Sequence, residues 1–310
     1  AFSIEAKSPP PGTGKADVPA NIYIMLDTSG SMRGIVNSQG RMYYPRDVAI
    51  DSNGNIYVVE HYYHRIRKYD SQGNFIKTFG ARGGIAQTYY PERIAIDAND
   101  NIYVAARYGI RKFNSDGVFK KSFSITRATG VAVDTAGNVY ATTTNNTFKW
   151  NSSGTRLAQL YVTSAYGLDW YGGSVYVTDR SNRRVRKYSD DLSVSSLTTF
   201  NLSSNTNAGD IEVNANGIYV ACESYCSKIQ KYSLSGTYQK QFGSFSSSSP
   251  SGFYYLYGIG SDSAGNIYGG SFSSHAIKKF SSDGVFISSA GPSNETRMSE
   301  VLKVIEKLTS

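Results

Sequence analysis

Cysteine, tryptophan, charged residues and long apolar runs are all scarce in this 310-residue chain, which has two Cys, two Trp and 18% charged residues. No stretch approaches the roughly 20 apolar residues that cross a bilayer, and the first residues lack the basic, apolar and small-residue order of a secretion signal. The sequence therefore predicts either a cytosolic protein or a mature form whose signal has been removed. A chain of this length buries an ample core, so its stability does not require disulfides.

Glycine and tyrosine are abundant instead, with 30 Gly and 25 Tyr beside many Ser, Asn and Thr residues. This composition favours short strands and tight turns over helices. Lys and Arg number 32 against 24 Asp and Glu, which gives a formal net charge of +8. Such an excess favours acidic partners, namely nucleic acid, acidic polysaccharide or an anionic surface. Cations dispersed over solvated strand faces are the simpler explanation.

A repeat of roughly 40 residues fills the middle of the chain. The clearest copies run from Tyr43 to Gly80 and from Tyr89 to Ser124, and four looser copies follow. Each copy holds four short runs with strand character, such as VAID, IYVV, RIRKY and NFIKTFG, separated by turn signals. Four antiparallel strands per repeat form the blade of a β-propeller. We therefore predict an all-β ring of six blades over residues 41–291.

The repeat pattern P-x-x-[IV]-A-[IV]-D-x-x-G-N-[IV]-Y-V, followed by R-I-x-K-[FY]-x-x-x-G, resembles the NHL repeat. The resemblance implies a propeller of a kind that mostly binds proteins or RNA, and that in a few cases is a lyase or a metal-dependent hydrolase. An acid that closes the second strand is Glu60 in the first copy and Asp179 in the fourth, but Ala106 replaces it in the second. This variation argues against one site repeated around the ring.

The stretch NIYIMLDTSGSM at residues 21–32 resembles the start of a von Willebrand factor A domain and its metal-ion-dependent adhesion site. Asp27 ends an apolar strand, and Ser29 and Ser31 follow at alternate positions. These three hard oxygen ligands suit Mg²⁺ or Mn²⁺, and the resemblance implies that a partner's carboxylate takes the open metal position. The family's later ligand loops are missing, so we expect an incomplete site and weak metal binding.

The first helix of such a domain follows the repeats, because Met298, Val301, Leu302, Ile305 and Leu308 stand at helical spacing. We therefore expect the propeller to be inserted into a truncated A domain. The expected segments are an N-terminal segment at 1–16, the A-domain strand and metal loop at 17–34, the propeller at 41–291 and the helix at 292–310. The two ends would add a small α/β piece to the fold. If the chain ends near Ser310, this piece would dock into another copy or a companion subunit, giving an oligomer or filament.

Histidine and cysteine provide two further candidate sites. Ring closure should bring His64 and His275 to equivalent positions of adjacent blades with His61 close by, which makes a zinc-type metal site conceivable. Exposed loop histidines are the simpler interpretation. Cys222 and Cys226 lie four residues apart around a predicted hairpin loop, a spacing that suits a disulfide, whereas a lone CxxxC lacks the second ligand pair of a zinc site.

These features together predict an extracellular or cell-surface protein that is not an enzyme and that works by adhesion or assembly. The propeller would be a rigid binding or spacing body, and its partner a protein or further copies of the chain. Two alternatives stay open: a metal-dependent lyase or hydrolase, and an RNA-binding propeller that uses its basic third strands. The aromatic residues of those strands are more simply core residues, which makes nucleic acid the less favoured partner. Acidic polysaccharide remains an open candidate.

Overall fold

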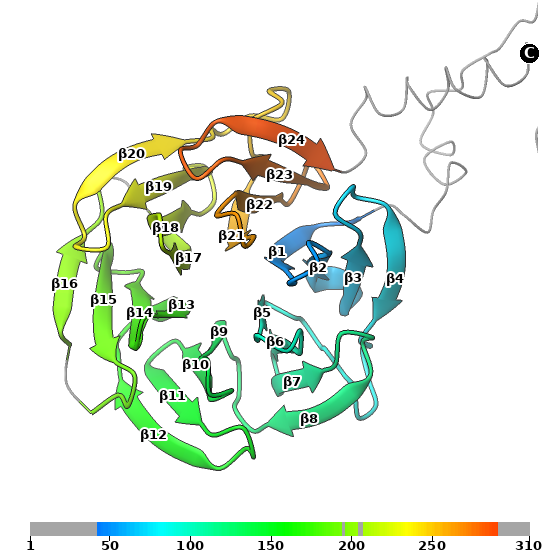
Figure 1. The fold of residues 1–310 in the computed structure, drawn as a ribbon, viewed down its shortest axis with the longest axis vertical. Helices are drawn as coiled ribbons and strands as arrows, with labels where there is room; N and C mark the ends of the chain where they lie inside the picture. The colour runs from blue at the N-terminus through cyan, green and yellow to red at the C-terminus, as the bar shows by residue number, and fades with distance from the viewer. Residues whose placement is uncertain (1–41, 194–195, 204–206, 291–310) are drawn as a thin grey trace, which may run out of the picture. The chain divides into compact units, whose positions relative to one another are not determined.

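The computed structural model describes residues 42–193, 196–203 and 207–290. These residues form six four-stranded antiparallel sheets, which are the blades of a ring around a central axis (Figure 1). The predicted six-bladed, all-β propeller is therefore confirmed. Within the described ranges, no helix combines the length and the apolar character that crossing a membrane requires.

The blades are made of consecutive strands. Blade 1 holds β1 (Pro45–Ile50), β2 (Ile56–Glu60), β3 (Arg65–Tyr69) and β4 (Phe75–Phe79), with the 3-10 helix η2 (His61–Tyr63) between β2 and β3. Blade 2 holds β5 (Arg93–Ile96), β6 (Ile102–Ala106), β7 (Gly109–Phe113) and β8 (Phe119–Phe123). Blade 3 holds β9 (Gly130–Val133), β10 (Val139–Thr143), β11 (Asn146–Trp150) and β12 (Arg156–Tyr161).

The second half of the ring repeats this order. Blade 4 holds β13 (Ala165–Tyr171), β14 (Ser174–Asp179), β15 (Arg184–Ser189) and β16 (Thr198–Asn201). Blade 5 holds β17 (Ala208–Asn214), β18 (Gly217–Cys222), β19 (Lys228–Tyr232) and β20 (Tyr238–Phe242). Blade 6 holds β21 (Leu256–Ser261), β22 (Ile267–Ser271), β23 (Ala276–Phe280) and β24 (Phe286–Ala290).

The antiparallel order gives the ring two distinct faces. The first strand of each blade lies nearest the axis and the fourth lies at the rim (Figure 1). We call the face on which the first strands begin the upper face. It carries the loops between second and third strands and the connections from one blade to the next. The lower face carries the turns between first and second strands and between third and fourth strands.

Apolar packing between neighbouring blades forms the core. At the junction of blades 1 and 2, for example, Tyr57, Val59 and Ile66 pack against Ile94 and Val104. The second strand of most blades is buried along its whole length, as in β2, β6 and β18. A four-stranded sheet this small cannot cover both of its faces alone, so each blade is stabilised by its neighbours.

The ring closes by side-chain packing between the first and last blades. Met42 and Val48 of blade 1 share one buried cluster with Tyr268 and Ile277 of blade 6. Each sheet contains only consecutive strands, so no strand is exchanged across this junction. The expectation that blade 1 lies beside blade 6 is confirmed.

The repeated D-x-x-G-N-x-Y motif is explained by the first lower turn of each blade. Asp51 Oδ1 accepts the backbone N–H groups of Asn53 and Asn55 at 3.0 and 2.8 Å, and its Oδ2 accepts hydrogen bonds from the Asn55 amide and the Tyr57 hydroxyl. Gly54 has φ of 79°, a conformation that glycine adopts without strain. The same contacts recur in blades 2, 3 and 6. The turn aspartates are thus part of the fold.

The predicted A-domain pieces lie outside the described residues. This applies to the segments at 1–16, 17–34 and 292–310, and to the proposed metal ligands Asp27, Ser29 and Ser31.

Candidate functional site

The first strands that surround the axis carry an unusual alternation of charge and glycine. Corresponding positions near the start of each first strand hold, in blade order, Asp47, Arg93, Gly130, Gly167, Asp210 and Gly258. A Cβ atom on Gly258 would overlap Asp47 Oδ1, and one on Gly167 would overlap the Gly209 carbonyl oxygen. Gly258 therefore leaves the room that the Asp47 carboxylate occupies, whereas Gly130 and Gly167 allow the backbone of the next blade to approach closely.

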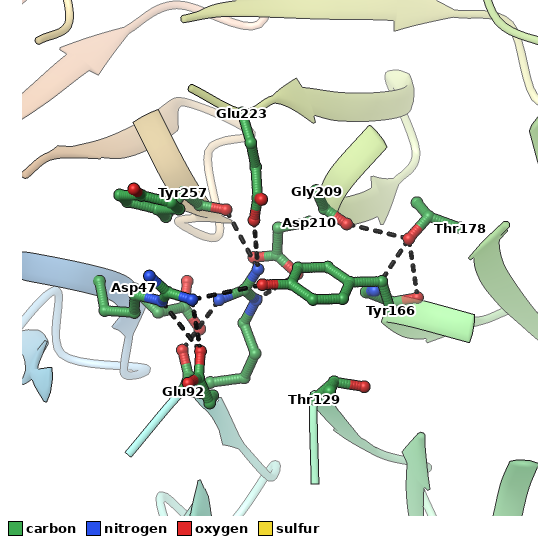
Figure 2. A network of polar contacts seen from close by, with 12 residues as sticks. Asp47, Glu92, Thr129, Tyr166, Thr178, Gly209, Asp210, Glu223 and Tyr257 are labelled. Carbon is green, nitrogen blue, oxygen red and sulfur yellow. Dashed lines mark hydrogen bonds and ion pairs between the residues drawn. The ribbon is translucent and has the colours of Figure 1, made fainter. Parts of the chain in front are cut away.

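Arg93 is the centre of this buried network and is only 2% exposed. Its Nε lies 3.2 Å from Asp210 Oδ1, and its Nη2 lies 3.2 Å from Glu223 Oε1. The same Nη2 donates a hydrogen bond to the Tyr257 carbonyl oxygen at 3.2 Å. Figure 2 shows these acceptors, Asp210, Glu223 and the Tyr257 carbonyl group, close to one another. A side chain of blade 2 thus joins blades 5 and 6 across the ring.

Carboxylates also link some neighbouring blades, as blade 1 to blade 2 and blade 5 to blade 6 show. Asp47 accepts the Ile94 N–H at 2.8 Å, and Asp210 accepts the Ile259 N–H at 3.1 Å. Burial raises the pKa of Asp47 well above its ordinary value, Asp210 raises it further, and Arg93 opposes the shift. Burial alone would lower the pKa of Arg93, but the surrounding acids outweigh it and raise that pKa well above its usual range. Arg93 is consequently a permanent cation.

The upper mouth of the channel is occupied by matched charges. Arg46 Nε donates to Glu92 at 2.9 Å, and the guanidinium lies 4.2 Å from the centre of the Tyr257 ring. Arg46 Nη2 also donates to the Tyr166 hydroxyl at 3.3 Å (Figure 2). The mouth is therefore filled by groups that bind one another.

The axial channel has a volume of about 220 Å³. Its lining includes Asp169, Glu212 and Ser261. Burial raises the pKa of Asp169 to about 7, and burial together with the charge of Asp169 raises the pKa of Glu212 well above its ordinary value. At neutral pH Asp169 therefore keeps its proton in a substantial fraction of molecules, whereas an exposed aspartate is ionised.

The three histidines lie on the upper face, as predicted, but their ring nitrogens contact the backbone. His64 Nδ1 accepts the Tyr90 N–H at 2.9 Å, and His275 Nδ1 accepts the Tyr44 N–H at 3.0 Å. His61 Nδ1 lies 2.9 Å from the Pro91 carbonyl oxygen. Among the described residues, no group of three His, Cys, Asp or Glu side chains is arranged to hold a metal ion. His64 and His275 therefore help to position the tyrosine pairs that precede Pro91 and Pro45, and the predicted zinc-type site finds no support among the described residues.

Aromatic rings form a nearly continuous surface over the upper loops of blades 6, 1 and 2. A chain of ring contacts with centroids 4.5 to 5.8 Å apart runs through the following residues: Tyr257, Phe272, Tyr62, His61, Tyr90, Tyr89 and Tyr108. Tyr62 and Tyr108 are 57% and 53% exposed. More than half of each side chain is therefore uncovered, so this surface is available to a partner.

A second aromatic group lies on the upper loops of blades 5 and 6. Tyr225, which is 74% exposed, contacts Phe245 and Tyr255. The loop that carries Tyr225 is closed by a disulfide between Cys222 and Cys226, the pair that the sequence indicated. The bond restricts the loop on which this ring is presented.

Charge is distributed unevenly between the faces. The described upper loops contain arginine but no lysine, namely Arg82, Arg107, Arg127, Arg180 and Arg183. The carboxylates of these loops within the described ranges are Glu92 and Glu223, and each is paired with an arginine. The upper face therefore presents tyrosine and arginine without a free acid.

Comparison with known proteins supports the propeller assignment. Residues 42–69 match the family model of the NHL repeat, whereas no curated protein matches the chain. Similar solved structures include a streptogramin B lyase, with a TM-score of 0.59, 14% identity and coverage of 82% of this chain and 85% of that one. A catalytically inactive virginiamycin B lyase from Staphylococcus aureus with quinupristin has a TM-score of 0.59 and 11% identity, and the match covers 84% of this chain and 87% of that one. The WD40 repeats of RRP9 have a TM-score of 0.59 and 11% identity, with coverage of 80% of this chain and 81% of that one. At these identities the likeness shows the fold alone.

Proposed function

We propose that this chain is a non-enzymatic binding protein of the cell surface or extracellular space, and that it binds a protein partner through its upper face. The observation that carries this proposal is the pairing of exposed tyrosine with arginine on that face, without a free carboxylate in the described loops. Adhesion and assembly are the functions that such a surface serves.

The composition of the upper face is that of a protein interface. Tyrosine and arginine are enriched in such interfaces, whereas lysine, aspartate and glutamate are depleted. Tyr62 and Tyr108 offer large, rigid rings whose ordering costs little entropy. Arg107 adjoins Tyr108, Arg82 lies 5.9 Å from the centre of the Tyr89 ring, and both are exposed. Arginine forms bidentate pairs with carboxylates more readily than lysine does. The face is therefore suited to an acidic protein surface.

The mouth of the channel favours binding over catalysis. Arg46 and Arg93 each contact carboxylates that are already in place, and the histidines of the upper face engage backbone groups. A catalytic acid or base must reach a substrate atom within hydrogen-bond distance, and these groups are committed to one another. The fold shared with streptogramin B lyase does not carry its activity to this chain.

The metal loop stays part of the proposal. Under this proposal, Asp27, Ser29 and Ser31 bind Mg²⁺ or Mn²⁺ weakly, and the bound metal makes a second contact, with a carboxylate of the partner protein. The resemblance of residues 21–32 to an adhesion site supports this step.

Binding to a defined acidic polypeptide tests the proposal. We expect the full chain to bind immobilised poly-L-glutamate at moderate salt, and the double variant Arg82→Glu, Arg107→Glu to bind about tenfold more weakly. The double variant Lys120→Glu, Lys240→Glu makes the same change of net charge on exposed lysines of β8 and β20, and should lose less than about twofold. Equal losses in the two variants would reduce the interaction to net charge and refute a specific upper face.

Two further measurements address the alternatives. Single-stranded RNA that binds more tightly than poly-L-glutamate at equal salt would favour the nucleic-acid interpretation. Lyase or hydrolase turnover that is lost in His64→Ala would favour an enzyme.

A further inference from the structure

The lower face is the electrostatic opposite of the upper face. Its turns contain many aspartates: Asp51, Asp70, Asp97, Asp100, Asp116, Asp134, Asp190, Asp191, Asp262 and Asp283. None of the described turn residues on this face is a lysine, an arginine or an aromatic residue. Lysines near this face lie on the strands instead, and some pair with turn aspartates, as Lys68 does with Asp51 and Lys279 with Asp262. One face is thus lined by carboxylates and the other by guanidinium groups and phenol rings.

Several of these carboxylates are available to a partner. Asp116, Asp191 and Asp283 are exposed, whereas Asp51 is buried in its own turn. Asp100 is half-buried and accepts hydrogen bonds from the backbone N–H and the hydroxyl of Ser52. Asp283 pairs with Lys231 at 3.0 Å, but its side chain remains 70% exposed. The exposed acids come from different blades, so they are spread around the ring as the upper arginines are.

We propose that the upper face of one copy docks on the lower face of a second copy, so that the propellers stack head to tail. This inference rests on the proposed function, because it names the acidic protein surface that the upper face binds. The two faces are complementary in charge, and both follow the same sixfold arrangement of blades. Such an interface is heterologous, and each added copy leaves one face of each kind open, so the stack can grow without closing.

The long-range charge of the chain opposes stacking only at low ionic strength. Two copies with a net charge of +8 repel each other, but the Debye length is about 10 Å at 0.1 M salt. At that salt the lysines of distant rims are screened from one another, while arginine and aspartate in direct contact still attract. Association should therefore be strongest near 0.1 M salt and should weaken at about 1 M.

Charge exchange between the two faces tests the stack. The upper variant is Arg82→Glu, Arg107→Glu, and the lower variant is Asp116→Lys, Asp283→Lys. In sedimentation velocity at about 0.1 M salt, the unchanged full chain should grow in mass with concentration. Each variant alone should stay at the mass of one chain, 33.9 kDa, because its two faces then carry like charge.

A mixture of the two variants is the decisive sample. The acidic upper face of the first variant now matches the basic lower face of the second, and the remaining two faces also match. An equimolar mixture should therefore recover association, whereas each variant at the same total concentration should not. The variant Lys120→Glu, Arg156→Glu changes exposed cations of β8 and β12 instead. It has the net charge of the upper variant and should associate like the unchanged chain.

Three results would overturn the inference. The first is a monomeric unchanged chain at all concentrations, and the second is an equimolar mixture that stays monomeric. The third is a lower variant that associates like the unchanged chain, because a symmetric contact between two upper faces would not involve Asp116 or Asp283. Poly-L-glutamate binding that persists in any of these cases would keep the proposed function and reject only the second copy as partner.

Discussion

Replacing Arg93 with methionine should destabilise the ring severely. Methionine keeps much of the side-chain volume but removes the cation that contacts Asp210 and Glu223. These acids and Asp47 are buried, so the variant keeps uncompensated charge inside the ring. Breaking a buried ion pair in this way costs about 3–5 kcal/mol. For a domain of this size, a loss of about 3 kcal/mol lowers the melting temperature by roughly 6–12 °C.

Arg111 offers a matched control in the same blade. It is also buried, but its side chain donates to the carbonyl oxygens of Tyr108 and Ile110, and no acid is paired with it. The position that holds Glu60 in blade 1 is Ala106 here. Because no paired acid offsets the effect of burial, the pKa of Arg111 is lowered. Arg111→Met should therefore cost only about 1 kcal/mol.

The pH dependence separates electrostatics from lost packing. In Arg93→Met, Asp47 and Glu223 lose the cation that opposes the rise of their pKa values on burial, so the folded state binds more protons than the unfolded state. The loss of unfolding free energy caused by the substitution is then fully present above the carboxyl pKa values of the folded state. It shrinks as the pH falls toward the pKa of the same carboxyls in the unfolded chain, near 4. Urea unfolding followed by circular dichroism at pH 7.5 and 5 measures it. A deficit equal to that of Arg111→Met, or independent of pH, would refute the role given to Arg93.

The other predictions concern the channel, the glycine positions, the disulfide and the metal loop. Because burial raises the pKa of Asp169 to about 7, the unchanged chain should gain stability as the pH falls from 8 to 6 in thermal melts, and a flat profile would contradict this. Gly258→Ala should cost at least about 2 kcal/mol because its Cβ overlaps Asp47, whereas Gly83→Ala, with open space around it, should be neutral or slightly stabilising in the same urea assay. Reduction of the disulfide should add two hydrogens to the intact mass and lower stability by about 2 kcal/mol, as expected for so short a loop. Asp27→Ala should abolish weak Mn²⁺ binding measured by electron paramagnetic resonance, and unchanged binding would remove that residue from the site.

Local patterns predicted the features of the ring that local chemistry determines. The motif that joins Asp51, Asn55 and Tyr57 lies within seven residues, so the hydrogen bonds among these three side chains need no residue outside that short span. The blade order follows from repetition of this span. Likewise, the four-residue separation of Cys222 and Cys226 was enough to suggest the bond that the structure forms.

The axial network could not be found in the same way. Arg93 meets Asp210 and Glu223 from more than 100 residues away in sequence, and no periodic pattern reports such a pair. One signal was present: aligned copies place Asp, Arg and Gly at a single position of an otherwise apolar strand. For the histidines, the sequence predicted the face on which they lie. It did not predict that the backbone N–H groups of Tyr44 and Tyr90 would donate hydrogen bonds to the rings of His275 and His64.

The two faces differ in why their residues are there. Aspartate begins lower turns because its carboxylate accepts the N–H groups of the turn, as Asp51 and Asp97 show, so part of the negative charge of that face follows from folding the repeat. No comparable requirement explains the exposed Tyr62, Tyr108 and Arg107, whose side chains contribute little to the buried core. Exposed apolar rings carry a risk of aggregation when they are left uncovered. A binding function therefore explains the upper face better than stability does, and the acidic lower face, already supplied by the fold, needs only a complementary surface to become an interface.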